Sequence, residues 1–169
     1  WMRQALAQGT EAAPLYRAKA WEIVSGQAYN WGRYEEMGVA AQAGLASARA
    51  AGDPRWITHG LALVGHHLQA TGEHEEARTC FQESRSLARQ CGDTQMAFFA
   101  ALHLAEYEPL GKRRRLLEEI MRQAPYAGRP YGLQFLARAA QLQGDLKSAE
   151  AYVRESLAGW TEAGNVGMQ

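Results

Sequence analysis

The chain has 169 residues, of which 18 are basic, 18 are acidic and 47% are hydrophobic. The apolar content suffices for a core, and the balanced charge gives no global field that would attract nucleic acid or an anionic membrane. No apolar run reaches membrane-spanning length, and no signal segment opens the chain, so we expect a cytoplasmic protein. Cys80 and Cys91 are the only cysteines. They lack metal-site spacing and suit a reducing compartment as buried or idle thiols.

A glycine-led segment recurs after forty residues. Residues 32–53 and 72–93 are identical at eight of 22 positions, and both segments begin with glycine and end with Gly-Asp. A period of this length is typical of stacked helix pairs, because one pair cannot bury its apolar face without its neighbours. The sequence therefore predicts an all-α, right-handed superhelical solenoid of antiparallel helix pairs. We expect about four pairs after an N-terminal partial helix.

In chain order, the expected partial helix at 1–8 is followed by four helix pairs. The pairs are 14–30 with 33–50, 54–70 with 73–90, 94–107 with 112–123, and 130–142 with 146–162. We expect a single repeat domain over 1–169, with repeats at 14–52, 53–92, 93–128 and 129–165. Asp53, Asp93 and Asp145 precede helices in equivalent places, so we expect each to cap the helix that follows.

The third pair departs from the period. Lys112 stands where the repeat predicts glycine, and Pro109 and Gly111 come just before it. Pro125 is expected to end the second helix early, and residues 124–130 form an irregular joint. Such a break indicates either a kink with a special surface or a tolerated defect.

Two of the pairs carry the same kinds of residue at matching positions. In the second pair these are Leu61, Val64, Gly65, Leu68, Gly72, Ala77 and Phe81, and in the fourth they are Leu133, Leu136, Ala137, Gly144, Asp145 and Ala149. Both sets resemble the tetratricopeptide repeat. The forty-residue period with Gly-Asp at both turns is similar to the long repeats in the C-terminal half of bacterial signal-transducing ATPases and LuxR-type multidomain regulators.

This resemblance implies a non-catalytic module of a larger bacterial signalling or transcriptional regulator. Such a module would bind a protein or peptide, and a small effector is the alternative ligand. In tetratricopeptide arrays the first helix of each pair lines the concave face, where partners bind. The positions that match this face are Lys19, Glu22, Tyr29, Asn30, His59, His66, Gln69, Phe99, Glu106, Tyr131, Gln134, Arg138 and Gln141. Their aromatic, amide and charged side chains suit an extended peptide, and an ordinary polar surface is the alternative.

A metal-dependent hydrolase is a contrasting possibility that the histidines raise. His59 and His66 are seven residues apart, so two helical turns bring them to one face, while His67 points elsewhere. Zinc needs three or four converging ligands, and the sequence has no HExxH motif. We therefore expect no catalytic residue, no metal and no cofactor.

The basic run Lys112–Arg115 raises a third possibility, which is binding to nucleic acid or to an acidic protein. Glu118 and Glu119 follow Arg114 and Arg115 by four residues, which is pairing distance within a helix. Nucleic-acid surfaces usually repeat such clusters along a face with aromatic residues between them. We expect a solvated, partly paired helix face, with acidic partners such as Glu106 or Glu108 nearby, and no direct contact with nucleic acid.

Both ends of the chain fall inside the repeat pattern, which suggests a piece of a longer array without terminal caps. The helix at 146–162 would then bare four apolar side chains on one side. They are Leu146, Val153, Leu157 and Trp160. Exposed apolar faces tend to find a partner, so we expect self-association through the array ends.

Overall fold

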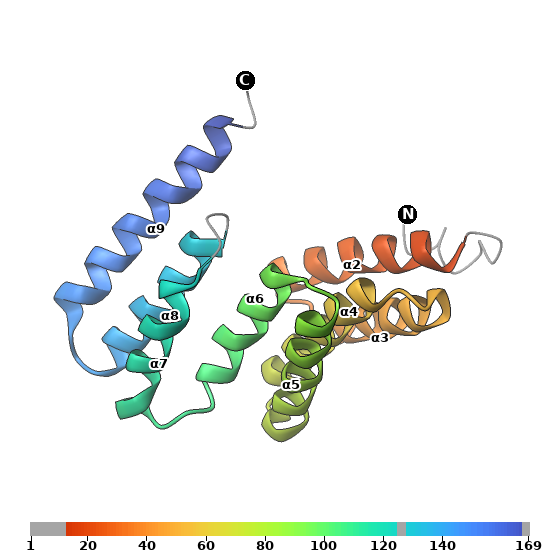
Figure 1. Ribbon diagram of the computed structural model, residues 1–169, viewed down its shortest axis with the longest axis horizontal. Coiled ribbons are helices and arrows are strands. Elements are labelled where there is room, and N and C mark those ends of the chain that lie inside the picture. Colours follow the sequence, from red (N-terminus) through yellow and green to blue (C-terminus); the bar gives the residue numbers. More distant parts are fainter. Residues whose placement is uncertain (1–12, 125–127, 167–169) are drawn as a thin grey trace. The chain divides into compact units, whose positions relative to one another are not determined.

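The structure is a computed structural model that describes residues 13–124 and 128–166, and its described residues form helices and no strand (Figure 1). The helices are α2 (Pro14–Asn30), α3 (Tyr34–Ala51), α4 (Pro54–Thr71), α5 (His74–Gln90), α6 (Thr94–Ala105), α7 (Leu110–Arg122), α8 (Arg129–Leu142) and α9 (Leu146–Val166). The expected all-α class of antiparallel helix pairs is confirmed. The partial helix expected at 1–8 lies outside the described residues, as does Pro125.

Three helix ends differ from expectation by two residues or more. Helix α6 ends at Ala105 rather than at 107, and α7 begins at Leu110 rather than at 112. Helix α7 starts early because Pro109 has φ −53°, which suits the residue just before a helix. Helix α9 continues to Val166 rather than ending near 162.

Glycines in the left-handed conformation end or follow most of these helices. Gly32, Gly52, Gly72, Gly92 and Gly144 have φ between 66° and 92°. A side chain is strained at such φ values, whereas glycine adopts them freely and lets the chain reverse direction. The glycines of the sequence repeat therefore mark the turns between antiparallel helices.

The aspartates that follow three of these turns cap the next helix, as expected. The Asp53 carboxylate accepts a hydrogen bond from the Arg55 amide at 3.0 Å, and Asp93 accepts one from the Met96 amide at 2.9 Å. Asp145 accepts the Ser148 amide at 3.1 Å. Each carboxylate satisfies an amide that the first helical turn leaves without a partner.

The chain forms two compact units, Trp1–Ala100 and Ala101–Gln169, and the boundary falls within α6. In the first unit α2 packs against α3, α3 against α4, and α4 against α5, while α2 also contacts α4. In the second unit α8 packs against α7 and α9. The pairing of neighbouring helices along the chain is the arrangement that the repeat predicts.

The buried apolar contact between helix pairs, which we call the seam, depends on small residues in the first unit. Ala41 and Leu45 of α3 form a buried cluster with Leu61 and Val64 of α4. At Gly60 an added Cβ would lie 2.9 Å from Leu45 Cα, so only glycine permits this backbone approach. Close approach and interdigitation give the seam its packing density.

Two buried serines make the same bond inside their helix pairs. Ser84 Oγ of α5 donates to the Thr58 carbonyl of α4 at 2.9 Å, and Ser156 Oγ of α9 donates to the Pro130 carbonyl of α8 at 2.7 Å. Thr58 and Pro130 occupy equivalent repeat positions, as do the two serines. The bond satisfies a buried hydroxyl, so it fixes how each second helix lies on its first helix.

Among the described residues, no helix combines the length and apolar character needed to cross a membrane.

Candidate functional site

The expected binding residues come from the first helix of each pair, and each unit holds its own part of them. In the first unit they lie on α2 and α4, with Phe99 on α6; in the second they lie on α8, with Glu106 just after α6. We call the part in the first unit, on α2, α4 and Phe99, the first-helix face. Lys19, Tyr29 and Asn30 of this face are exposed, whereas Glu22, His59, His66 and Gln69 are half-buried.

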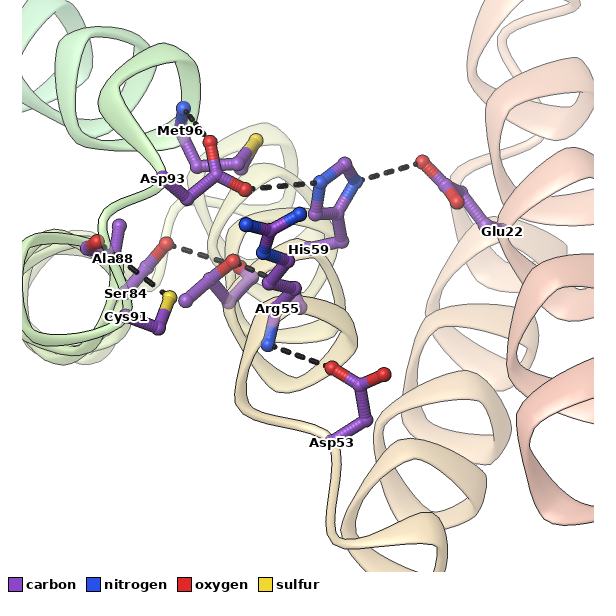
Figure 2. Close-up of polar contacts among 10 residues, drawn as sticks. Glu22, Asp53, Arg55, His59, Ser84, Ala88, Cys91, Asp93 and Met96 are labelled. Carbon is purple, nitrogen blue, oxygen red and sulfur yellow. Dashed lines mark hydrogen bonds and ion pairs between the residues drawn. The ribbon is translucent and has the colours of Figure 1, made fainter.

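His59 links α2, α4 and the start of α6 at this face. Its Nδ1 lies 3.0 Å from Glu22 Oε1 on α2, and its Nε2 lies 3.9 Å from Asp93 Oδ2, as Figure 2 shows. The hydrogen bond to Glu22, with the negative charges of Glu22 and Asp93, raises the pKa of His59 above its usual value despite burial. The imidazole therefore holds two carboxylates near one point of the face.

Trp56 belongs beside this group, and sequence reasoning missed it. Its ring centroid lies 5.2 Å from that of His59, and the Lys19 Nζ lies 5.2 Å from the Trp56 ring centroid. The contact with the ammonium group is a cation–π interaction between α2 and α4. The sequence spacing could have identified Trp56, because it precedes His59 by three residues and so lies one helical turn away on the same side of α4.

A second group on the face is aromatic. The His66 ring lies between Tyr29 of α2, Phe81 of α5 and Phe99 of α6, with centroid distances of 6.0, 5.5 and 5.3 Å. Burial lowers the pKa of His66 to about 4, so the ring is neutral near pH 7. It therefore packs as an aromatic residue, while Tyr29 keeps 51% of its surface exposed.

His67 points away from this face, as the helical spacing predicts. An added Cβ at Gly38 of α3 would lie 2.5 Å from the His67 ring, so this imidazole packs against α3. The two adjacent histidines thus serve different contacts of the same helix. His66 lies on the first-helix face, and His67 lies between α4 and α3.

In the second unit, Glu106 contacts two of its neighbours. Arg138 Nη1 of α8 lies 2.9 Å from Glu106 Oε1, and His103 Nδ1 lies 3.7 Å from Glu106 Oε2. Tyr131 of α8 places its hydroxyl 3.2 Å from His103 Nε2. His103 was not among the expected residues, although it precedes Glu106 by one helical turn.

The amides of the expected set show less convergence. Asn30 lies at the last position of α2, and Gln134 and Gln141 are exposed along α8. They are available to solvent or to a bound chain. The structure therefore gathers the charged and aromatic members into groups and leaves these amides at the surface.

The basic run at 112–115 is partly used inside the second unit. Arg113 donates to the backbone carbonyls of Glu106 and Glu108, the two acidic residues expected near the run. These two carbonyls lie in the α6–α7 turn, outside any helix, and a guanidinium can donate to several carbonyls at once.

Arg114 in the same run bridges two acidic residues. Its Nε lies 3.2 Å from Glu118 Oε1, as the four-residue spacing predicts, and its Nη1 lies 2.7 Å from Asp145 Oδ2. Hydrogen bonds from Ser148 and Arg114 lower the pKa of Asp145 to about 2. Arg114 thereby ties α7 to the cap of α9, which favours the structural interpretation of the run.

No cluster of three or more His, Cys, Asp or Glu side chains suited to a metal ion occurs in the part of the chain that the structure describes. His59 is held between carboxylates and His66 between aromatic rings, so the two histidines of the hydrolase hypothesis face different surroundings. Both cysteines are half-buried free thiols.

Comparison with known proteins shows the fold alone. No protein-family model matches the chain, and no curated protein matches its sequence. The crystal structure of BtubC (BKLC) from P. vanneervenii is similar over 96% of this chain and 72% of that chain, with TM-score 0.65 and 14% identity. The apo form of RapI is similar over 96% of this chain and 62% of that chain, with TM-score 0.66 and 15% identity.

This chain therefore spans less than two thirds of the RapI chain. The two similarities, together with the helix pairs described above, show that the chain has the fold of a helical repeat array.

Proposed function

We propose that the chain is a non-catalytic binding module that holds an extended segment of a partner protein on its first-helix face. The observation that carries this proposal is the meeting of α2 and α4 side chains. Glu22 contacts His59, and Tyr29 lies 6.0 Å from His66 between ring centroids. Side chains of successive first helices thus form one surface, which is what a chain laid across them needs.

The chemistry of this surface supports an extended peptide. The half-exposed Tyr29 ring offers apolar area at a small cost in conformational entropy. Asn30 carries both donor and acceptor groups, which can satisfy the backbone of an extended chain. Glu22 and Lys19 provide charges of both signs. A segment with a basic and an acidic residue near an apolar one would match these groups.

The second unit presents a comparable mixture on α8. Arg138 is 68% exposed while it pairs with Glu106, and Gln134 and Gln141 lie on the same helix. Arg138 is the exposed member of this pair, and Glu106 also contacts His103, so Arg138 can bind an acidic group of a ligand instead. This surface would extend the binding capacity to a second segment.

A small effector is the alternative ligand. Small molecules bind best in concave sites that cover most of their surface. Lys19, Tyr29 and Asn30 are all exposed, which favours a long, flat ligand over an enclosed one.

We also propose that the module belongs to a larger bacterial signalling or transcriptional regulator, as the forty-residue period with Gly-Asp turns suggests. Binding on the first-helix face would then report the partner to other domains. The complete gene sequence tests this point, since neighbouring nucleotide-binding or DNA-binding domains are expected. A gene that encodes a repeat array alone would contradict the regulator context and leave the binding proposal in place.

Selection from a displayed peptide library tests the binding face. Peptides selected on the immobilised chain should bind with micromolar dissociation constants and lose at least about tenfold in affinity to a Tyr29→Ala, Asn30→Ala variant. Fluorescence anisotropy of a labelled peptide measures the change. Both side chains are exposed, so the helical content should stay the same by circular dichroism.

Tyr34→Ala is the matched control, because Tyr34 is 43% exposed but lies on α3, a second helix. Peptide binding should be unchanged in this variant. If the Tyr34 variant loses affinity and the α2 variant does not, the first-helix face is the wrong surface.

A further inference from the structure

Helix α9 carries an apolar stripe that nothing in the described chain covers. Leu146, Val153, Leu157 and Trp160 are 67%, 46%, 61% and 45% exposed. Spacings of seven, four and three residues place them along one side of the helix. The expected exposure of these four residues is confirmed. We call them the α9 stripe.

The repeat shows what this side of a second helix does elsewhere. Val153, Leu157 and Trp160 are equivalent to Ala41, Leu45 and Ala48 of α3, which are 0%, 5% and 1% exposed. Ala41 and Leu45 are buried against Leu61 and Val64 of α4, the first helix of the next pair. Val153, Leu157 and Trp160 of the α9 stripe therefore form one half of a contact between helix pairs, with larger side chains than α3 has at two of these positions.

Among the described residues, the matching half of such a contact is exposed on α2. Tyr16 and Ile23 are 67% and 52% exposed, and we call them the α2 stripe. Their equivalents on α4 are Trp56 and Leu63. Both equivalents face the preceding pair, because Trp56 lies against Lys19 of α2 and Leu63 packs on the cluster that includes Ala41 and Leu45. Tyr16 and Ile23 thus mark the side of α2 where a preceding pair would pack.

We propose that the partner of the α9 stripe is the α2 stripe of a second copy of this chain. The two stripes are complementary halves of a contact that the chain already makes between α3 and α4. This pairing is head-to-tail, so each copy keeps one free stripe and can add another. No residue of the two stripes was assigned to the first-helix face, although Tyr16 borders it, with Lys19 Nζ 5.9 Å from the Tyr16 ring centroid.

The contact is apolar, and this sets its properties. Burying exposed Leu, Val, Ile and Trp side chains drives association and is little affected by salt. One seam between two helices is smaller than the interfaces of stable dimers, which bury about 1,200–2,000 Å². Association should therefore be weak and should produce species larger than dimers as concentration rises.

Sedimentation velocity of the 169-residue chain from about 10 μM to about 1 mM tests the contact, since weak associations have dissociation constants in this range. The wild-type chain should show a rising weight-average mass. Leu157→Glu and Ile23→Glu should each raise the dissociation constant at least tenfold, because each buries a charge in the seam. Val39→Glu is the matched control, since Val39 is 68% exposed but lies on α3 outside both stripes.

Mixing the two variants identifies the geometry. The Leu157→Glu chain keeps its α2 stripe, and the Ile23→Glu chain keeps its α9 stripe. An equimolar mixture should therefore form a dimer and nothing larger, although each variant alone is monomeric. Circular dichroism checks that both exposed substitutions leave the helices intact.

Three results would overturn the proposal. A monomeric wild-type chain at the highest concentration would show that the stripes do not pair. Loss of association in Leu157→Glu but not in Ile23→Glu would indicate α9 pairing with α9. Failure of the mixture to dimerise, with wild-type association intact, would exclude the head-to-tail contact.

Discussion

The turns of the first unit and the α6–α7 turn of the second unit are held by different means. From α2 to α6 each pair of successive helices is joined through a glycine with positive φ. Between α6 and α7 no glycine takes this role, and Arg113 instead donates to the carbonyls of Glu106 and Glu108. A turn can thus depend on backbone freedom or on a side chain that satisfies the open carbonyls.

The comparison extends to the way helices are held together. The first unit brings backbones into close approach at Gly60 and packs His66 among aromatic rings. The second unit ties α7 to the α9 cap through Arg114 and Asp145. Close packing also occurs in the second unit, where an added Cβ at Gly159 of α9 would lie 2.7 Å from Pro130 Cγ of α8. The arginine contacts therefore distinguish the irregular third pair rather than the whole second unit.

The largest effect is expected from acid, and it should fall on the first unit. The pKa of His66 is lowered to about 4 in the folded chain, so the neutral ring contributes stability that is complete above pH 6.5. This contribution is lost as pH falls from 6.5 to 4 and amounts to about 3 kcal/mol. Denaturant unfolding followed by tryptophan fluorescence measures it, since Trp21 and Trp56 lie in the first unit.

A His66→Phe variant isolates that contribution, because phenylalanine keeps the ring contacts but cannot take up a proton. The unfolding free energy of the wild type should fall relative to that of the variant as the pH falls from 6.5 to 4. His59 acts in the opposite sense, because its raised pKa gives stability that is present below pH 6.5 and lost as pH rises through the folded value. An equal acid dependence in wild type and variant would contradict the role of His66.

Glycine replacement in the seam should have the next largest effect. In Gly60→Ala the new Cβ would lie 2.9 Å from Leu45 Cα, so the backbone must move, at a cost of about 2 kcal/mol even though alanine favours helices. Gly26→Ala is the control, because an added Cβ there meets nothing within 4 Å and should stabilise α2 by about 0.5–1 kcal/mol. Denaturant unfolding should show a lower free energy of unfolding for Gly60→Ala and a higher one for Gly26→Ala. Equal changes in the two variants would contradict the role of close packing at Gly60.

Removing the arginine contact should weaken the second unit by less. Arg113→Met keeps much of the aliphatic stem but leaves the Glu106 and Glu108 carbonyls without this donor, which costs about 1–2 kcal/mol. Lys112→Met, at an exposed position of the same run, should change stability by less than about 0.5 kcal/mol. Hydrogen exchange should show faster opening near α7 in the first variant alone. Unchanged exchange there would mean that Arg113 does not hold the turn.

The smallest effect concerns a glycine turn of the first unit. Gly52 has φ 66°, so Gly52→Ala strains the backbone by about 1 kcal/mol, although the added Cβ meets no atom within 4 Å. Gly52→Asn should cost less, because asparagine tolerates this conformation better. The midpoints of thermal unfolding should rank wild type first, Gly52→Asn second and Gly52→Ala last. If both variants are as stable as wild type, the turn does not depend on backbone freedom.

Several features of the fold could be predicted from residues close in the sequence. The helix pairs follow from apolar spacing, and the turns follow from Gly-Asp, because a left-handed glycine and a capping aspartate act within a few residues of themselves. The same locality explains why the spacing of His66 and His67 predicted their different directions. At the less regular α6–α7 joint, helix ends were off by two residues, since Pro109 and Arg113 decide them without a repeat to follow.

For the candidate site, the helical positions were predictable from periodicity and from the tetratricopeptide resemblance, whereas the partners of each side chain were not. Only the tertiary structure places Glu22 and Asp93 on opposite nitrogens of His59, 37 and 34 residues away along the chain. It also decides that His66 is neutral, because burial depends on Phe81 and Phe99 from other helices. Periodicity specifies which way a side chain leaves its own helix, and packing between helices determines what it meets there.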